Sequence, residues 1–421
     1  MSVIVSIPSI KSMLAKKRVR QTGVLYLSLV ASLVLGIIVS VINTRQLSPQ
    51  AFGDFKFLQT VWTLGVAFIT FGLFTTGGNL LAARGTPESE RSLMGSLLTI
   101  AGIISLLFIV AMALASFPVG QIYGQELGGK MRLFSALVFV FPLQVYLQEV
   151  LRGTNNITSL SLLNALPQLL YIPLALGASR FTEFSLDTAL LLYLLSLLVT
   201  AMVLIIRARP SFGHLRQGIQ EVMVNNRAIG MHVYVAILVT TVTTQLSQFS
   251  LAYFFDTRLV GIFSLALTIT MPLTMIPNAI STTFFKQFAS LDRIPRKVIV
   301  GAMTISFATL LVFLVVIKEL ILFLYTDKFI DVVPLAYICA VGAVLHGLGD
   351  VYNRYLLVHG KTRALRVNAV QLGFISVMGY VFLVAWWGVS GAALTKLLVD
   401  AVYLATMLLY YKKYRNLEAT V

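Results

Sequence analysis

Residues 93–117 read LMGSLLTIAGIISLLFIVAMALASF, and no charged residue occurs between Arg91 and Glu126. An apolar run of about 20 residues crosses a hydrocarbon core about 30 Å thick. Backbone groups in lipid must be hydrogen-bonded within their own segment, so a span of this length is a helix. This stretch therefore predicts a transmembrane helix, and the rest of the chain repeats its pattern.

The composition of the whole chain indicates the same class of protein. Hydrophobic residues make up 58% of the 421 positions and charged residues 11%, against about 25% charged residues in an ordinary soluble domain. The net charge of +16 would suit a nucleic-acid-binding protein. The basic residues instead separate long apolar runs, so we expect a membrane protein with membrane lipids, and no nucleic acid, around it.

Twelve apolar runs are long enough to span a bilayer. We predict an all-α polytopic membrane protein with twelve transmembrane helices. Their ranges are 22–43, 57–82, 93–117, 132–152, 157–178, 186–206, 229–254, 259–285, 298–325, 332–357, 363–387 and 389–411.

The Lys and Arg residues are distributed unevenly over the connections between these spans. Of the 32, the connections on one side hold 23 and those on the other side hold 8, while Lys396 lies within a span. Cytoplasmic loops of membrane proteins carry an excess of Lys and Arg. We therefore expect both termini in the cytoplasm, which requires an even number of spans.

The longest basic connection, 207–228, follows the sixth span, and the halves on its two sides share a faint repeat. Five pairs of identical residues lie 208 positions apart, namely Gly53 and Gly261, Phe55 and Phe263, Thr60 and Thr268, Thr75 and Thr283, and Pro87 and Pro295. Parallel repeats of this kind form two similar bundles related by an axis along the membrane normal.

We accordingly predict two pseudo-symmetric six-helix bundles around a central cleft. The bundles comprise 22–206 and 229–411, and 207–228 is a cytoplasmic linker. We also expect residues 1–21, before the first bundle, and residues 412–421, after the second, to lie in the cytoplasm. The basic sequence of residues 1–21 suits either an amphipathic helix on the membrane surface or a disordered tail.

The residues after the first span carry a resemblance to a known family. Residues 44–55 read TRQLSPQAFGDF, the second span contains the Gly-rich FGLFTTGGN at 71–79, and TRLVGIF at 257–263 opens the second half. Together with the twelve spans and paired halves, this resembles the polysaccharide-biosynthesis flippases of the multidrug/oligosaccharidyl-lipid/polysaccharide exporter superfamily.

The resemblance implies a function in the bacterial inner membrane. The protein would flip undecaprenyl-pyrophosphate-linked oligosaccharide, as repeat units of O-antigen, capsule or exopolysaccharide, from the cytoplasmic to the outer face by alternating access. Coupling to protons or sodium, and contact with a glycan polymerase or chain-length partner, are left open by the resemblance. Nothing in the sequence indicates a stable oligomer, so we expect a monomer.

A flippase needs a polar cleft, because each unpaired hydroxyl moved into hydrocarbon costs several kcal/mol. Amides and hydroxyls would bind sugars, and cations would bind phosphate. On span seven, Thr241, Thr244, Gln245 and Gln248 share one helical face, which we expect to line the cleft unless it packs against another helix. Asn79 on span two is a weaker candidate of the same kind.

The deepest charges are Lys396 and Asp400, four residues apart on one face of the last span. Charges at membrane depth usually face a bundle interior or an aqueous cavity. Two interpretations follow for this pair. Lys396 lines the cleft while Asp400 couples transport to an ion, or the two form a neutralised structural pair.

Spans four and ten each carry an acid–base pair toward the cytoplasmic end. The pairs are Glu149 with Arg152, next to Gln148, and Asp350 with Arg354. We expect either an inward-facing vestibule for pyrophosphate or two interfacial ion pairs with snorkelling arginines. Asp350 is also a second ion-coupling candidate.

Other single residues leave two interpretations each. His346, one turn before Asp350, is either a group that titrates near neutral pH or a packing residue. Arg45, after the first span, meets either the head group or the lipid surface. Gly72, Gly77 and Gly78 in span two, and Pro272 and Pro277 in span eight, permit either functional bending or simple packing kinks.

The chain lacks the sequence motifs that are typical of other functional classes. The chain has no GxxxxGK[ST] phosphate loop, no HExxH motif and the single cysteine Cys339, so we expect no ATP hydrolysis, cofactor, metal or enzyme activity. A cation-coupled multidrug antiporter of the same superfamily is the alternative. Those antiporters often use an acid in span one or seven, which this chain lacks, but Asp350 keeps the alternative open. A glycan-processing enzyme would need paired carboxylates near the outer face.

Overall fold

The computed structural model describes residues 17–181 and 183–418, which form helices and short connections without a β-strand. In the first half the helices are α2 (Lys17–Gln46), α3 (Pro49–Ile69), α4 (Leu73–Ala82), α5 (Pro87–Tyr123), α6 (Gln125–Phe134), α7 (Val140–Gly153), α8 (Ile157–Phe181), α9 (Leu186–Ala208) and α10 (Leu215–Asn225). The π-helical turn η1 (Asn226–Gly230) leads into the second half. The alternatives for residues 1–16 lie outside the described residues.

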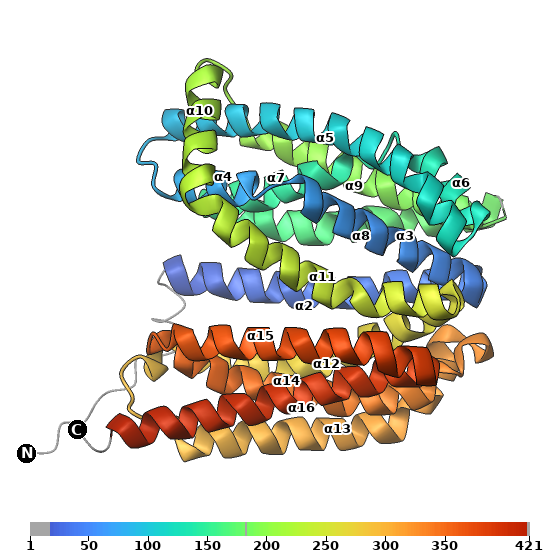
Figure 1. The fold of residues 1–421 in the computed structure, drawn as a ribbon, viewed down its shortest axis with the longest axis vertical. Coiled ribbons are helices and arrows are strands. Elements are labelled where there is room, and N and C mark those ends of the chain that lie inside the picture. The colour runs from blue at the N-terminus through green and yellow to red at the C-terminus, as the bar shows by residue number, and fades with distance from the viewer. Residues whose placement is uncertain (1–16, 182, 419–421) are drawn as a thin grey trace, which may run out of the picture. The chain divides into compact units, whose positions relative to one another are not determined.

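The second half continues the all-helical pattern (Figure 1). Its elements are α11 (Met231–Phe254), α12 (Thr257–Phe288), α13 (Arg296–Tyr325), η2 (Asp327–Phe329), α14 (Val332–Val358), α15 (Thr362–Met378), the π-helical turn η3 (Gly379–Leu383) and α16 (Val384–Glu418). Among the described residues, nine helices are long and apolar enough to cross a membrane, or ten with the bent pair α3–α4. The predicted all-α polytopic membrane class is confirmed, and the number of twelve spans stays a prediction.

Several predicted spans differ in detail from the helices. The range 57–82 is broken, because α3 and α4 meet at an angle of 67°. The range 132–152 contains the last residues of α6 and nearly all of α7. The last two predicted spans lie in one helical stretch, Thr362–Arg415, which bends at Gly388 with a φ of 56°.

The chain divides into two compact units, each of which is built from three separate stretches of the sequence. Unit 1 comprises Met1–Ile42, Gly65–Pro118 and Gly128–Ile237, and unit 2 comprises Asn43–Leu64, Val119–Leu127 and Leu238–Val421. Helices α3 and α11 each run from one unit into the other. The predicted domain boundaries at 206 and 229 stay a prediction.

In unit 1, the break between α3 and α4 is stabilised by residues from the start of the second half. Phe71 and Gly72 have positive φ angles of 45° and 72°, so the carbonyls before the break lose their helical partners. The side-chain amide of Asn226 donates to the carbonyl of Phe71 at 3.0 Å, and the hydroxyl of Tyr234 donates to that of Phe68 at 2.8 Å. The break at Gly72 is therefore stabilised by specific hydrogen bonds. Pro272 and Pro277, by contrast, do not interrupt helix α12.

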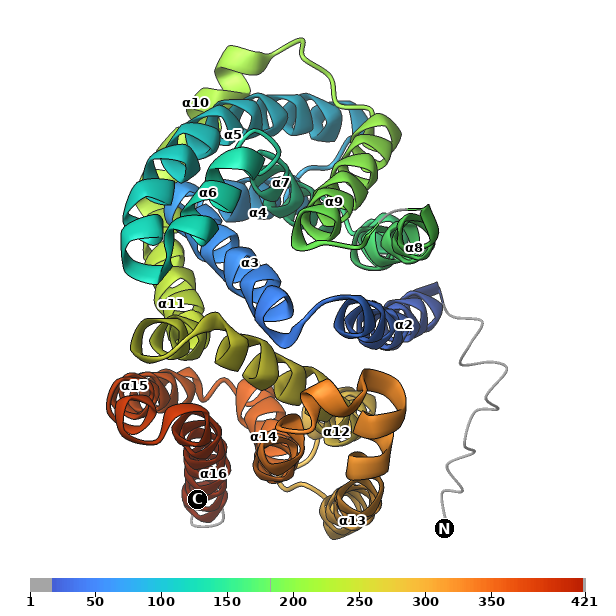
Figure 2. The ribbon, with the colours of Figure 1, turned by 90° about the vertical axis from the view of Figure 1, so that its right-hand side faces the viewer.

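In unit 2, α14 lies between α12 and α16 (Figure 2) and packs against both. The aromatic residues Phe288, Tyr355 and Tyr411 belong to one buried cluster at this contact. Small residues let the helices approach closely. At Gly342 on α14, a Cβ atom would lie only 2.8 Å from Oδ2 of Asp400 on α16. This close packing brings polar side chains of three helices together.

The repeat is visible at the starts of α3 and α12, which both belong to unit 2. The first residues of these helices, Pro49 and Thr257, are 208 positions apart. Each helix is capped by the residue before it. The hydroxyl of Ser48 accepts a hydrogen bond from the backbone N–H of Ala51 at 3.1 Å, and the carboxylate of Asp256 accepts one from Leu259 at 2.9 Å. The faint sequence repeat thus corresponds to equivalent helix N-termini.

Candidate functional site

A polar cavity of about 280 Å³ lies between α3, α11 and α12 in unit 2. Its lining residues are Lys56, Gln59, Thr60 and Thr63 of α3, Gln245 and Gln248 of α11, and Ser264, Leu267 and Thr268 of α12. The α3 residues follow the i, i+3, i+4, i+7 spacing of one helical face. The cavity therefore combines a cation with amides and hydroxyls, the groups that sugars and phosphates require.

The two helical walls of the cavity use equivalent positions of the repeat. Lys56 and Ser264 are 208 residues apart, as are Thr60 and Thr268, and all four line the cavity. Equal positions on equivalent helices place polar faces opposite each other. The two walls differ in charge, because only the α3 position carries a lysine.

A lysine and a serine of the cavity make no hydrogen bond or ion pair with a described residue. The Lys56 side chain is half-buried, makes no ion pair or hydrogen bond, and lies 5.5 Å and 6.0 Å from the ring centroids of Phe52 and Phe55. The hydroxyl of Ser264, a residue 7% exposed, also has no hydrogen-bond partner. The ring contacts of Lys56 are cation–π interactions, so both groups keep hydrogen-bonding capacity that a ligand in the cavity could use.

The threonines and two of the glutamines in the cavity bond to one another or to their own helix. Thr60 donates to the side-chain oxygen of Gln248. Thr63 donates to the Gln59 carbonyl at 2.7 Å, and Thr268 donates to the Ser264 carbonyl at 2.8 Å. These hydroxyls keep acceptor lone pairs for a ligand.

The structure separates the four predicted span-seven residues. Gln245 and Gln248 line the cavity, whereas Thr241 and Thr244 do not. Thr244 donates to the carbonyl of Thr241 at 2.9 Å, the intrahelical bond that often satisfies threonine in helices. Asn79 and Gln148 are exposed on α4 and α7 of unit 1, and they stay predictions.

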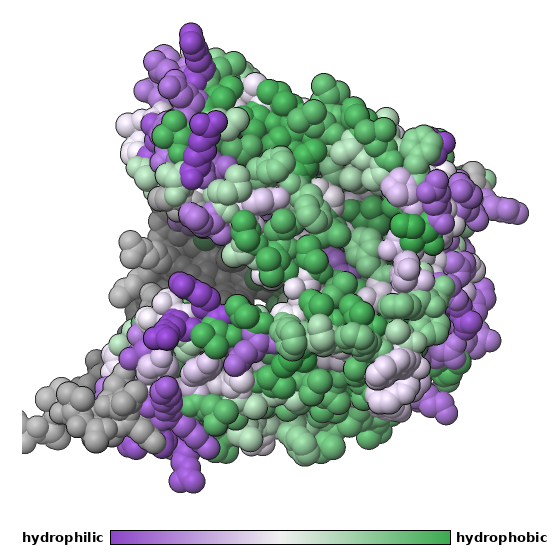
Figure 3. Space-filling model, in the orientation of Figure 1, coloured by the Kyte–Doolittle hydropathy of each residue, from purple (hydrophilic) through white to green (hydrophobic). Residues whose placement is uncertain are grey.

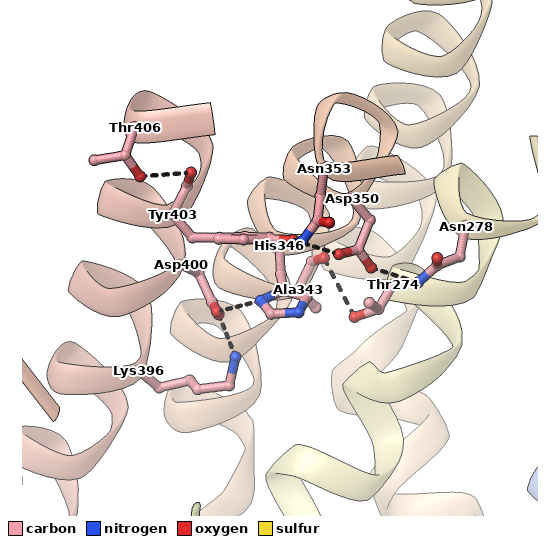
Figure 4. Close-up of polar contacts among 10 residues, drawn as sticks. All are labelled: Thr274, Asn278, Ala343, His346, Asp350, Asn353, Lys396, Asp400, Tyr403 and Thr406. Carbon is pink, nitrogen blue, oxygen red and sulfur yellow. Dashed lines mark hydrogen bonds and ion pairs between the residues drawn. The ribbon is translucent and has the colours of Figure 1, made fainter. Parts of the chain in front are cut away.

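A second polar cluster connects α12, α14 and α16 in unit 2 (Figure 4). Asp400 is 1% exposed and pairs with Lys396 on its own helix. Its other oxygen lies 2.9 Å from Nδ1 of His346 on α14. The carboxylate is therefore neutralised from within the protein, as the structural interpretation of this pair expects.

Asp350 in the same cluster accepts hydrogen bonds from neutral groups only. The Tyr403 hydroxyl donates to one oxygen at 2.7 Å, and the Asn278 amide donates to the other at 2.7 Å. Arg354 donates to the amide oxygen of Asn278 at 2.9 Å. The expected ion pair between Asp350 and Arg354 is thus replaced by a bridge through Asn278, because the α12 side chain reaches between them.

The two halves of this cluster are linked by one aromatic side chain (Figure 4). The ring of Tyr403 stacks on His346 with centroids 4.7 Å apart, while its hydroxyl also accepts from Asn353 at 2.6 Å. Sequence spacing places Asp350 and His346 on one face of α14. Only the packing of α16 shows that Tyr403 joins them.

The cations predicted to meet phosphate all have protein partners. Arg45 donates to the carbonyls of Phe323 and Leu324 at 2.6 Å and 2.9 Å, and so caps the last turn of α13. Arg152 forms the expected ion pair with Glu149 at 2.9 Å. Lys396 and Arg354 are held by Asp400 and Asn278. The cavity lysine, Lys56, was missed, although its spacing with Gln59, Thr60 and Thr63 could have indicated a polar face.

Residues 19–290 match the model of a protein family described as polysaccharide biosynthesis protein. The chain belongs to this family. The resemblance carried by residues 44–55 and 71–79 is therefore confirmed. No curated protein sequence matches the chain significantly.

Solved structures show which fold this polysaccharide biosynthesis protein shares. The lipid II flippase MurJ, in an inward closed conformation, is 11% identical, with a TM-score of 0.74 over 92% of this chain and 87% of that one. An inward-facing multidrug resistance MATE family transporter of the MOP superfamily is 15% identical, with a TM-score of 0.71 over 93% and 96%. A MOP superfamily transporter from Pyrococcus furiosus is 13% identical, with a TM-score of 0.60 over 94% and 96%.

Proposed function

We propose that this protein flips a lipid-linked oligosaccharide across the membrane and that the cavity between α3, α11 and α12 receives the polar head group. The observation that carries the proposal is the pair of unpartnered groups, Lys56 and Ser264, in a cavity otherwise lined by amides and hydroxyls. Family membership and the fold shared with a lipid II flippase support it.

Each part of the cavity suits one part of such a substrate. The amides of Gln59, Gln245 and Gln248 can donate to and accept from sugar hydroxyls, which otherwise cost several kcal/mol each in an apolar medium. The Lys56 ammonium carries a charge that no described carboxylate neutralises, and ammonium–phosphate hydrogen bonds are roughly twice as strong as neutral ones. The phosphate linkage of the substrate would therefore bind at Lys56.

Family membership supports a finer proposal for the substrate. We propose undecaprenyl-pyrophosphate-linked repeat units of O-antigen, capsule or exopolysaccharide, carried through the bacterial inner membrane with both termini in the cytoplasm. Transport of this kind makes and breaks no covalent bond, so it needs no catalytic group.

A cation-coupled multidrug antiporter is the second candidate, and Asp350 favours it. This carboxylate accepts hydrogen bonds from the neutral groups of Asn278 and Tyr403 and forms no ion pair with a described residue, so a proton or sodium ion could bind to it. Lys56 argues against this candidate, because an unpaired ammonium in the cavity repels cationic drugs. The flippase is therefore the better-supported function.

A complementation experiment tests the proposal. A deletion strain should accumulate lipid-linked repeat units on the cytoplasmic face and lose surface glycan. Wild-type protein and Lys56→Arg should restore the glycan, whereas Lys56→Gln should reduce it at least tenfold. Lys318→Gln removes an exposed lysine of α13 and is the matched control. Normal surface glycan in the deletion strain would refute the flippase function.

A further inference from the structure

The connection 207–228 contains helix α10, which packs against other helices of unit 1. On one face of α10, Glu221 forms an ion pair with Arg84, and Val222 is fully buried. A Cβ atom at Gly218 would overlap the hydroxyl of Ser96 on α5, so only glycine allows this approach. These contacts determine which face of α10 points away from the protein.

The opposite face of this connection carries arginines without partners. The side chains of Arg207, Arg209, Arg216 and Arg227 are exposed and make no ion pair or hydrogen bond with any described residue. Glu221 is the only acidic residue between 207 and 228, and Arg84 already neutralises it. Four positive charges therefore remain available to an external anion.

Exposed apolar side chains lie among these arginines. Phe212, Met223 and Val224 are 54%, 45% and 61% exposed. Arg216, Met223 and Arg227 follow i, i+7 and i+11 spacing, so they form one stripe. A stripe that combines arginine with large apolar residues is typical of helices that lie in the membrane interface.

The position of α10 in unit 1 agrees with this interpretation. The apolar helices α9 and α11 end at Ala208 and begin at Met231, so short segments tether α10 to candidate spans on both sides. Figure 3 shows hydrophilic surface over α10 next to the apolar surface of α5. Helix α10 thus lies where hydrophilic surface meets the apolar surface of α5 (Figure 3).

We propose that the exposed face of α10 binds the head groups of anionic phospholipids. Arg216 and Arg227 would contact lipid phosphates, for which the planar guanidinium is well suited. Phe212 and Met223 would enter the boundary between head groups and acyl chains. The binding would hold the connection between the two halves on the membrane surface.

Lipid binding by the purified full-length protein tests this proposal. In neutral detergent, titration with phosphatidylglycerol should give protein–lipid complexes in native mass spectrometry, with phosphatidylcholine as the uncharged reference. Arg216→Gln/Arg227→Gln should lower the phosphatidylglycerol affinity by roughly 25-fold, at about fivefold per basic residue. Binding of phosphatidylcholine should not change.

The control removes two exposed basic residues elsewhere. Lys412→Gln/Lys413→Gln carries the same change of charge on the last turns of α16 and should retain at least half of the wild-type affinity. An equal loss in this control, or wild-type affinity in the α10 variant, would overturn the proposal.

A second measurement locates the helix directly. The variant Phe212→Trp, in vesicles containing phosphatidylglycerol with brominated acyl chains, should show quenched fluorescence of the added tryptophan relative to the parent protein. An unquenched signal would mean that this face does not enter the membrane interface, which also overturns the proposal.

Discussion

Gly53 and Gly261, which occupy the same position in the two copies of the repeat, are in direct contact. A Cβ atom on Gly261 would lie 2.9 Å from the Cα atom of Gly53, and one on Gly53 would overlap the carbonyl of Thr257. The starts of α3 and α12 therefore touch through their backbones. One to two turns further along, their equivalent polar residues line the cavity.

This contact predicts that Gly53→Ala destabilises the protein. The added methyl group meets backbone atoms, which cannot rotate away, and overpacking of this kind costs about 1–3 kcal/mol. Gly102→Ala on α5 is the control, because nothing lies within 4 Å of its Cβ position. That variant should gain about 0.5–1 kcal/mol from helix propensity. Thermal unfolding in detergent checks both, and equal stability of the two variants would contradict the prediction.

Ser264→Ala should affect stability and transport in opposite ways. The Ser264 hydroxyl has no partner in the protein, so its removal should leave stability unchanged or raise it by up to about 1 kcal/mol. Transport, measured as surface glycan restored in a deletion strain, should fall because the substrate loses a hydrogen bond. Ser306→Ala on α13 removes another buried, unpartnered hydroxyl and should leave transport unchanged. Equal transport in the two variants would remove Ser264 from the site.

Asp400→Asn should destabilise the protein because it leaves Lys396 without a counter-charge. The cost should be about 2 kcal/mol, below the roughly 3–5 kcal/mol of a fully buried pair, since the Lys396 side chain is 30% exposed. The double variant Lys396→Gln/Asp400→Asn should recover most of the stability. If it also recovers transport, the pair is structural; a stable double variant without transport would show that the pair takes part in transport.

Asn226→Ala should loosen the break between α3 and α4. The variant removes the donor to the partly buried carbonyl of Phe71 and the acceptor of the buried Thr76 hydroxyl, and a buried polar group left unsatisfied costs about 1–3 kcal/mol. Hydrogen–deuterium exchange should therefore increase in residues 66–76 and 226–236. Asn225→Ala is the neighbouring control, because Asn225 donates only to Glu221 within its own helix. Unchanged exchange in the Asn226 variant would show that the break does not depend on this residue.

The sequence predicted the helical membrane class because hydropathy and charge distribution are local properties. A run such as 93–117 must be a helix in lipid whatever surrounds it. The ion pair of Glu149 with Arg152 and the pairing of Lys396 with Asp400 were also predictable, because residues three or four apart share a helical face. The repeat at an offset of 208 matches the starts of α3 and α12, although the predicted spans began at 57 and 259.

Contacts between helices could not be predicted in this way. Asn278 separates Asp350 from Arg354, and Asn226 stabilises a break about 150 residues earlier. Side chains from α3, α11 and α12 line the cavity. Its lysine, Lys56, lies within α3, whereas the predicted span began at residue 57 and left Lys56 in the preceding connection. Hydropathy and local spacing thus determined the class of protein, the helices and their short-range pairs. Tertiary packing alone decided which polar groups are satisfied within the protein and which, like Lys56 and Ser264, make no hydrogen bond with a described residue, because that depends on residues far apart in the chain.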